Sequence, residues 1–340
     1  MRFFRKTNID FIGKRRMWYM VSIAVTLAGL IGAFTKGVEF GIDFAGGTEL
    51  QLDFQKEVEI EQIRGALEKG GFRGAEVKYY GADESGVLVR VREGATGTEA
   101  ESAEVTRNVL STIQTNIQGN PAEMLQQQHI GPKIGNELRQ KALLAVGFTA
   151  LMILIYLGIR FRPIYGLGAV IAMIHDVLVA FGVAVLMNNV FPWLNLEMNS
   201  TLLAAFLTLI GFSVNDTVII FDRVREDLKK YRGDDLKTIM NRAINETLPR
   251  TLITTGTVFV TLIVLFIWGG EVLRGFAFTM IIGVIVGTYS SVYVATSIVY
   301  DYITNKKGGE AEGQRMSAGN AANRPAMMAA RKEKRVPASV

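Results

Sequence analysis

A carboxylate lies inside an apolar stretch of this chain, in the segment GFSVNDTVIIFDR (residues 211–223). Asp216 follows the start of the apolar run 201–221 by fifteen residues and precedes its end by five. At about 1.5 Å per helical residue, it would lie roughly 22 Å from one end of the run and ~8 Å from the other. A carboxylate at such a depth in a bilayer is costly, so it either has a partner or marks a route for protons or ions. Three polar neighbours could support such a route: Ser213, Asn215 and Thr217.

The best partner for this carboxylate is Arg250, which begins the apolar segment RTLITTGTVFVT (250–261). Helical spacing places Thr254 and Thr257 on the same face as Arg250, so one face carries a guanidinium and several hydroxyls. Burial raises the pKa of a carboxylate, and a nearby arginine lowers it. Moving Arg250 away from Asp216 would therefore favour protonation, which is one way to couple conformation to proton passage.

Simpler interpretations of both residues stay open. Asp216 could be an interfacial residue of a shorter span, close to Asp222 and Arg223. Against this, the wholly apolar residues 218–221 separate it from the interface. Arg250 could anchor its helix at the membrane surface, while the threonines after it bond to their own backbone.

A second acidic residue, Asp176, follows His175 in the middle of another apolar run. A His–Asp pair at that depth is also expensive and should face other helices. The pair could join a proton relay, orient the helix that carries Asp216, or simply pack. The chain has no Cys and only two His, which excludes thiolate and His-cluster metal sites. We therefore expect no metal, no cofactor and no catalytic residue.

These residues need membrane-spanning helices to position them. The chain of 340 residues is 49% hydrophobic and 20% charged, with a mean hydropathy of +0.24, as in integral membrane proteins. About 20 apolar residues cross a ~30 Å hydrocarbon core. Six runs are suitable: 17–34, 142–159, 164–187, 201–221, 252–268 and 276–300. The first follows a basic lead without a cleavage site, so we interpret it as an uncleaved span.

The distribution of Lys and Arg predicts the orientation of these spans. The lead 1–16 carries six basic residues, and the segment 222–250 carries eight. The alternate loops 188–200 and 269–275 hold a single arginine between them. Both ends of the chain should therefore be cytoplasmic, and residues 35–141 should lie on the other side of the membrane.

Residues 35–141 have the pattern of a small folded domain. Alternating strands and helical spacing follow one another in the order β-α-β-β-α-β, which is that of a ferredoxin-like unit. The expected strands and helices are, in chain order, 48–54, 59–69, 75–80, 86–91, 98–117 and 123–130. The fold class is thus an α-helical polytopic membrane protein of six spans, with an α+β extracytoplasmic domain between the first two.

Both connections of this domain contain residues that favour turns. GIDFAGGTEL (41–50) leads into it and IGPKIGNELRQKA (130–142) leads out. We expect hinges at these positions, although loops that merely join the two parts are an equally simple interpretation. The residues concerned are Gly46, Gly47, Thr48, Gly131 and Pro132.

Two segments on the cytoplasmic side complete the organisation. Within 222–250, apolar residues from Leu236 to Leu248 recur at helical spacing after Asp234 and Asp235. They predict an amphipathic helix lying against the cytoplasmic face of the bundle. The tail 305–340 carries eight Lys or Arg against three Glu and shows no periodicity, which predicts a disordered segment near anionic lipid.

Several of these motifs together resemble the SecD/SecF family of bacterial protein-export membrane proteins. GIDFAGGTEL resembles the Gly-Gly-Thr stretch after the first span of that family, and HIGPKIGNELRQKA resembles the connection into the second. GFSVNDTVIIFDRVRE and NETLPRTLITTGT resemble the SecF members in particular. The resemblance covers most of residues 1–304, and the tail is not included in it.

The resemblance implies six spans of an RND-like repeat, paired with six more from a SecD partner in the bacterial inner membrane. It implies association with the SecYEG channel and SecA, and by extension with YajC and YidC. Such complexes use the proton-motive force to promote the translocation and release of preproteins, without enzyme activity. Asp216 and Arg250 occupy the positions of the family's proton route. We expect contacts with preprotein and membrane lipid, and none with nucleic acid.

Two rival functions are compatible with the sequence. An RND-type exporter of small molecules or lipids uses the same repeat, but usually has two repeats in one chain and larger outer domains. A passive assembly scaffold would use Asp216 and Arg250 as a structural pair. The effect of neutralising Asp216 on proton-driven export discriminates between these hypotheses.

Overall fold

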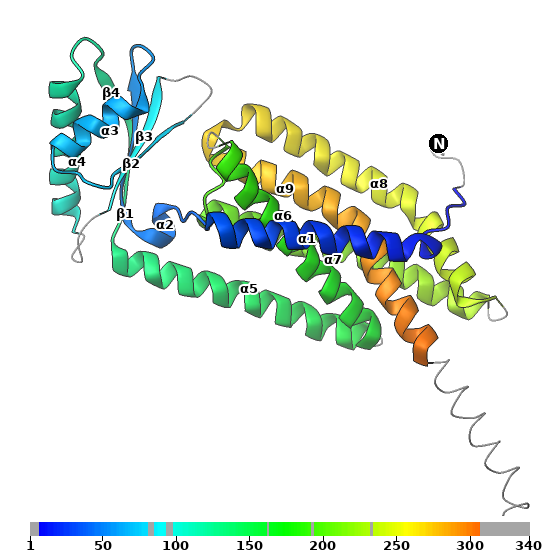
Figure 1. The fold of residues 1–340 in the computed structure, drawn as a ribbon. Coiled ribbons are helices and arrows are strands. Elements are labelled where there is room, and N and C mark those ends of the chain that lie inside the picture. Colours follow the sequence, from blue (N-terminus) through cyan, green and yellow to red (C-terminus); the bar gives the residue numbers. More distant parts are fainter. Residues whose placement is uncertain are drawn as a thin grey trace, which may run out of the picture.

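The computed structural model describes residues 7–80, 85–92, 98–161, 163–191, 194–231 and 234–306. It consists of a bundle of long helices with a smaller α+β domain at one end (Figure 1). The predicted disordered tail lies outside the described residues from position 307 onward, and so does the start of the basic lead.

Six helices within the described part of the chain are long and apolar enough to cross a membrane. They are α1 (Arg15–Lys36), α5 (Pro132–Arg160), α6 (Pro163–Val190), α7 (Ser200–Lys230), α8 (Leu236–Trp268) and α9 (Gly270–Ser290). A π-helical turn, Ser291–Ala295, continues α9 toward Lys306. Each predicted span lies within one of these helices. The helices are longer than the spans because polar residues at their ends continue the backbone hydrogen bonding beyond the apolar run.

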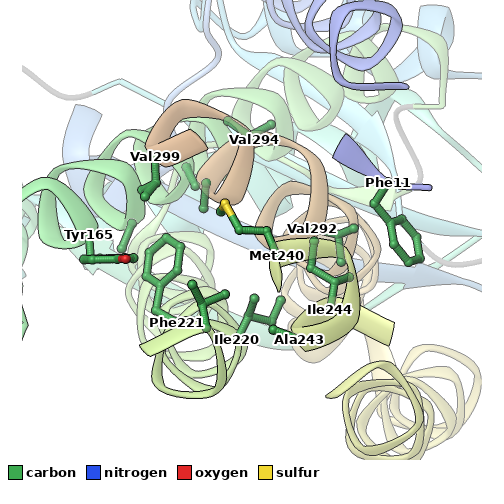
Figure 2. Packing of buried hydrophobic residues seen from close by; sticks show 14 of the residues in the cluster. Phe11, Tyr165, Ile220, Phe221, Met240, Ala243, Ile244, Val292, Val294 and Val299 are labelled. Atoms are coloured by element: carbon green, nitrogen blue, oxygen red, sulfur yellow. The ribbon is translucent and has the colours of Figure 1, made fainter. Parts of the chain in front are cut away.

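The predicted amphipathic segment 236–248 is helical, but the expectation of a separate element was wrong. It forms the first part of α8, which passes through Pro249 without ending. Asp235 caps this helix, its side chain accepting a hydrogen bond from the Thr238 N–H at 3.3 Å. Pro249 removes one backbone hydrogen bond, and the packing of the helix on α7 and α9 on either side compensates for this loss. Figure 2 shows the buried side chains of this part of α8 among those of α7: Met240, Ala243 and Ile244 beside Ile220 and Phe221.

The described residues before α1 are bound to the same part of α8. The Ile9 N–H donates to Oδ1 of Asn245 at 3.0 Å, and the Ile9 carbonyl accepts from Nδ2 of Asn245 at 2.9 Å. The Phe11 N–H donates to Oδ1 of Asn241, also at 3.0 Å. The lead is thus held by a helix that lies 236 residues later in the sequence.

The small domain has the predicted order of strands and helices. Its sheet runs β2-β3-β1-β4 with every neighbouring pair antiparallel, as in ferredoxin-like folds. The elements are α2 (Ile42–Ala45), β1 (Gly47–Phe54), α3 (Ile60–Lys69), β2 (Glu76–Tyr79), β3 (Gly86–Val91), α4 (Glu99–Asn116) and β4 (Ala122–Ile130). Helices α3 and α4 cover one face of the sheet (Figure 1), where their apolar side chains bury those of the strands: Ile63, Leu67, Val109 and Ile113 against Leu50, Leu52, Val87 and Val89.

The two connections of the domain pack against each other. Gly46 and Gly47 have φ angles of 75° and 126°, in the region that favours glycine. A Cβ on Gly46 would lie 2.9 Å from Cα of Pro132, the first residue of α5. Thr48 is fully buried at the start of β1, and its hydroxyl lies 3.0 Å from Oγ of Ser102 in α4. The two motif segments that include Gly46, Gly47, Thr48, Gly131 and Pro132 therefore form one joint, and rotation of the domain about that joint stays a prediction.

A buried ion pair fixes the domain to the bundle. Arg90 of β3 donates to Glu197, in the turn between α6 and α7, at 2.6 Å, and both side chains are 4% exposed. Lys78 of β2 donates to the other oxygen of Glu197 at 2.7 Å. Beside this contact, the main chain of Phe40 forms a parallel bridge with that of Met198. The turn that precedes α7 is thus attached to the sheet by charge, and to the connection between α1 and α2 by backbone pairing.

The two cations keep Glu197 ionised. Burial by itself would raise the pKa of Glu197, but Arg90 and Lys78 outweigh it and hold the pKa below its usual value of 4.5. Glu49 accepts from the same Arg90 guanidinium at 2.7 Å. Its pKa is raised, because burial there outweighs the attraction of Arg90. The ion pair between Arg90 and Glu197 is therefore the one that persists as the pH falls.

Replacing Glu197 with Gln should loosen the domain from the bundle, because loss of one partner of a buried ion pair costs about 3–5 kcal/mol. The chain has no Cys, so a disulfide between Phe40→Cys and Met198→Cys reports docking cleanly. We expect the cross-linking yield to fall in Glu197→Gln. The yield should be unchanged in Glu61→Gln, which removes an acid from an exposed pair on α3. Equal yields in both variants would contradict a role for the ion pair in docking.

The distance between spin labels attached to Phe40→Cys and Met198→Cys should be the same from about pH 8 to about pH 5; a disulfide is unsuitable for this series because thiols react slowly in acid. A carboxylate with a lowered pKa stabilises the docked state above its usual pKa of 4.5, and this contribution is lost only as the pH falls through the lowered value. Glu49 acts in the opposite sense, since its raised pKa makes protonation favour the folded contact. A marked increase in this distance between pH 7 and pH 5 would show that another group controls docking.

Candidate functional site

Helix α7 carries the polar residues that the sequence singled out, and most of them face the bundle. Ser213, Asp216 and Thr217 are buried on the face that packs against α6, α8 and α9. Asn215 is exposed on the opposite side of the helix. The helical repeat explains this division, since positions three and four apart share a face while the residue before Asp216 points away. Asn215 is therefore not brought into the site within this chain.

Asp216 is 2% exposed and its nearest hydrogen-bonding partner is a threonine. Its Oδ2 accepts from the Thr255 hydroxyl of α8 at 3.5 Å, and Thr255 lies 3.2 Å from the Thr288 hydroxyl of α9. Its Oδ1 is buried and has no hydrogen-bond partner among the described residues. A buried carboxylate oxygen with an open acceptor site is unusual, because most buried polar atoms are satisfied.

The predicted direct ion pair between Asp216 and Arg250 is not formed. Arg250 is exposed, and no salt bridge within 4.0 Å joins these two described residues. The positive charge of Arg250 still acts on Asp216 through space. The two residues are thus placed so that a small movement of α8 against α7 would change their interaction.

The threonines nearest to the carboxylate differ from those predicted. Thr257 is exposed and Thr254 is half-buried, and their hydroxyls donate to backbone carbonyls of α8 at 2.8 and 3.0 Å, respectively. That is the backbone-bonded state described above as the simpler interpretation. The face turned toward α7 carries Thr251, which is 1% exposed, and Thr255. A signal for this face was present, because Met240, Ile244, Thr247, Thr251 and Thr255 continue one stripe at spacings of three and four residues.

Asp176 forms a second and more completely satisfied site. It is fully buried on α6, and its Oδ2 accepts from the hydroxyls of Ser213 at 2.5 Å and Ser290 at 2.7 Å. Its Oδ1 lies 2.9 Å from Nδ1 of His175. Three helices, α6, α7 and α9, therefore meet at one carboxylate. The sequence indicated the His–Asp pair, whereas Ser290 gave no signal of its own.

The hydrogen bonds continue from His175 to the first helix. Nε2 of His175 lies 3.0 Å from the Tyr289 hydroxyl, which lies 3.3 Å from the Ser22 hydroxyl of α1. The Tyr289 ring also packs edge-on against the His175 ring, with centroids 5.7 Å apart. Neither Tyr289 nor Ser22 was predicted, since isolated hydroxyl residues in apolar runs are common and only the fold brings these two together.

The two carboxylates are linked through α7. Ser213, which binds Asp176, lies one turn before Asp216 on the same buried face. The Thr217 hydroxyl lies 2.8 Å from that of Ser291, at the start of the π-helical turn of α9. A π-turn inside an α-helix is often found at functional sites.

This arrangement can hold and pass protons. A carboxyl group gains or loses a proton, and each hydroxyl around it can donate one hydrogen bond and accept two. No group of three or more His, Cys, Asp or Glu with metal-binding geometry occurs among the described residues. The predicted residues Gly46, Gly47, Thr48, Gly131 and Pro132 lie apart from this site, at the joint of the small domain.

The spans, the buried carboxylates and the ferredoxin-like domain after the first helix define a polytopic membrane protein. The profile of the family described as protein export membrane protein SecD/SecF, C-terminal, matches residues 109–305. The profile of the SecD/SecF GG motif matches residues 31–58, which contain Gly46 and Gly47. The chain belongs to the SecD/SecF family.

Curated relatives and solved structures agree with this assignment. The protein translocase subunit SecF of Rhodothermus marinus is 38% identical over 301 residues, covering 88% of this chain and 95% of the relative. The SecF of Calditerrivibrio nitroreducens is 38% identical over 296 residues. The crystal structure of SecDF from Thermus thermophilus, described as a translocon-associated membrane protein, matches with a TM-score of 0.76 and 32% identity. That match covers 88% of this chain but 39% of the SecDF chain, so this chain spans about two fifths of the solved protein.

Removing the hydroxyls around Asp176 should destabilise the bundle. Ser213→Ala and Ser290→Ala each delete a hydrogen bond to a buried carboxyl group, which costs about 1–3 kcal/mol. Thr261→Ala is a suitable control, because the Thr261 hydroxyl is exposed and bonds only to its own helix. The free energy of unfolding of the solubilised chain, measured by denaturant titration, should fall in the two serine variants and change by less than about 0.5 kcal/mol in the control. Equal effects in all three would contradict the assigned network.

Proposed function

We propose that this chain is the SecF subunit of the Sec translocase and that, with SecD, it uses the proton-motive force to promote preprotein translocation and release after SecA-driven export. The observation that carries the proposal is a pair of buried carboxylates, Asp216 and Asp176, surrounded by hydroxyls on the helices that the family shares. A carboxylate that is buried without a salt bridge is a natural site for a proton to bind and leave.

Helix α7 provides the mechanical connection in this proposal. It holds Asp216 and Ser213 in its middle, and it begins at Ser200, three residues after Glu197. The Ser200 N–H also donates to Asp43 of α2 at 2.8 Å, next to the joint of the domain. A shift of α7 that accompanies protonation would therefore act directly on the contacts that hold the domain. Movement of the domain would then bias the exported chain forward.

Arg250 would supply the electrostatic control. In the described conformation it acts on Asp216 at a distance, while Thr255 provides the nearest hydrogen bond. Approach of the guanidinium would favour the ionised carboxylate, and its withdrawal would favour the protonated form. Alternation between these arrangements would couple proton passage to the position of α8 relative to α7.

The proposed partners follow from the relatives. The solved neighbours are SecDF chains in which the matching part is about two fifths of the whole, so the remainder would be supplied here by a separate SecD. Association with SecYEG, SecA, YajC and YidC belongs to the same proposal. The complex would lie in the bacterial inner membrane with both ends of this chain in the cytoplasm, which the distribution of Lys and Arg supports. The chain would need no cofactor and would have no enzyme activity of its own.

The proposal is tested by release of an exported reporter from inner-membrane vesicles with and without a proton gradient, comparing wild type with Asp216→Asn. The Asn variant keeps the size of the side chain and removes the titratable group. We expect it to abolish the dependence on the gradient while the protein still assembles with SecD. Asp222→Asn is the matched control, since Asp222 lies on the same helix, is exposed, and makes only a long 3.7 Å contact with Arg160.

Two outcomes would reject the proposal. If Asp216→Asn keeps gradient-dependent release at equal membrane levels, Asp216 is a structural residue and a passive scaffold becomes the better description. If gradient-driven efflux of small molecules or lipids is lost while protein release is unaffected, the chain works as an RND-type exporter.

A further inference from the structure

A cavity with a basic lining lies at the end of the bundle opposite to the small domain. It has a volume of about 580 Å³ and is formed by the end of α5, the start of α6 and the last turns of α7. Three cations line it, namely Arg160, Arg225 and Lys229, together with the aromatic rings of Phe161 and Tyr165. Among the described residues that line the cavity, none is acidic. The cavity is therefore suited to an anion.

The positive charges in the cavity are not fully neutralised by nearby carboxylates of the described residues. Arg225 and Lys229 lie one turn apart on α7, both are exposed, and within the described residues neither has a carboxylate within 4.0 Å. The neighbouring acid Glu226 is turned away and accepts from Arg223 at 2.7 Å. Arg160 makes only the 3.7 Å contact with Asp222, and its guanidinium lies 5.2 Å from the centre of the Phe161 ring. Three positive charges thus converge without a matching set of negative ones.

The surroundings of the cavity are apolar and exposed. Ile159, which lines it, is 84% exposed, and Ile155 one turn earlier on α5 is 46% exposed. On α6, Leu167 and Ile171 are exposed at helical spacing beyond the cavity. A soluble anion would gain nothing from these faces, whereas a lipid would place its acyl chains on them. Basic side chains at the edge of a membrane also interact favourably with anionic lipid.

We propose that this cavity binds the phosphate headgroup of an anionic phospholipid, with the acyl chains lying on the exposed faces of α5 and α6. Arg225 and Lys229 contact the phosphate from α7, and Arg160 contacts it from the end of α5. In the orientation proposed above, the lipid belongs to the cytoplasmic leaflet. The site uses none of the side chains of the proton site.

A lipid at this position would hold the end of α7 against α5 and α6. Tyr165 of α6, which lines the cavity, packs edge-on against Phe221 of α7 with ring centroids 5.1 Å apart. Phe221 lies five residues after Asp216 on the same helix. The headgroup therefore bridges α5 and α7, next to the point where the Tyr165–Phe221 contact joins α6 to α7.

The experiment titrates the purified full chain in detergent with phosphatidylglycerol and, separately, with phosphatidylcholine, and counts bound lipids by native mass spectrometry. The wild-type chain should bind phosphatidylglycerol at least about tenfold more tightly than phosphatidylcholine. In the double variant Arg225→Gln/Lys229→Gln the affinity for phosphatidylglycerol should fall about thirtyfold. This corresponds to ~2 kcal/mol, from two basic contacts at about 1 kcal/mol each. The swap Arg225→Lys/Lys229→Arg keeps both charges and should change binding by less than about threefold.

The matched control is Arg16→Gln/Lys230→Gln. It removes two exposed cations from the same end of the bundle, outside the cavity. Equal loss of phosphatidylglycerol binding in both double variants would overturn the site in favour of general attraction between charges. Unchanged binding in the cavity variant would overturn it as well. Displacement of the lipid by inorganic phosphate at a similar concentration would show a site for soluble anions and would overturn the assignment to lipid. If the double variant fails to fold, Lys229→Gln alone serves the same test.

Discussion

The need to satisfy buried carboxylates determines how the helices of this bundle meet. A carboxyl group placed among apolar helices requires hydrogen bonds or a cation nearby. Asp176 accepts hydrogen bonds from the Ser213 and Ser290 hydroxyls, with oxygen–oxygen distances below 3 Å. These bonds hold α7 and α9 against α6. The hydrogen-bonding requirement of Asp216 is satisfied only in part: one carboxylate oxygen accepts a long hydrogen bond, and the other has no partner among the described residues. Asp176 is thus fully hydrogen-bonded and Asp216 only partly, and α7, which carries Ser213 and Asp216, joins the two sites.

That helix gives the protein its long-range organisation. One end of α7 starts beside the buried Arg90–Glu197 pair, and its middle carries Ser213 and Asp216. Its other end lines the basic cavity. Long helices transmit displacement along their axis well, because each backbone hydrogen bond constrains the next. The domain, the carboxylates and the far end of the bundle are thus connected by one rigid element and not by a series of loops.

The sequence predicts the large features because each rests on a local pattern. Apolar runs give the spans, alternation gives the strands of the domain, and the isolated acids Asp176 and Asp216 stand out against their surroundings. Contacts between helices are a different matter. On α8 the sequence predicts the face of Thr254 and Thr257, because the stripe that leads to Thr255 becomes visible only when residues 236–268 form one continuous helix. Ser290, Tyr289 and Glu197 had no local signal, since their roles depend on neighbours more than 70 residues away.

The contact between the lead and α8 has a consequence for biogenesis. Ile9 is synthesised before its hydrogen-bonding partner Asn245, which lies 236 residues later in the chain. The first span, α1, is therefore synthesised while the residues before it have no partner in α8. Attachment becomes possible only when α8 has been made, so the beginning of the chain is fastened late, after the domain and three further spans have been produced.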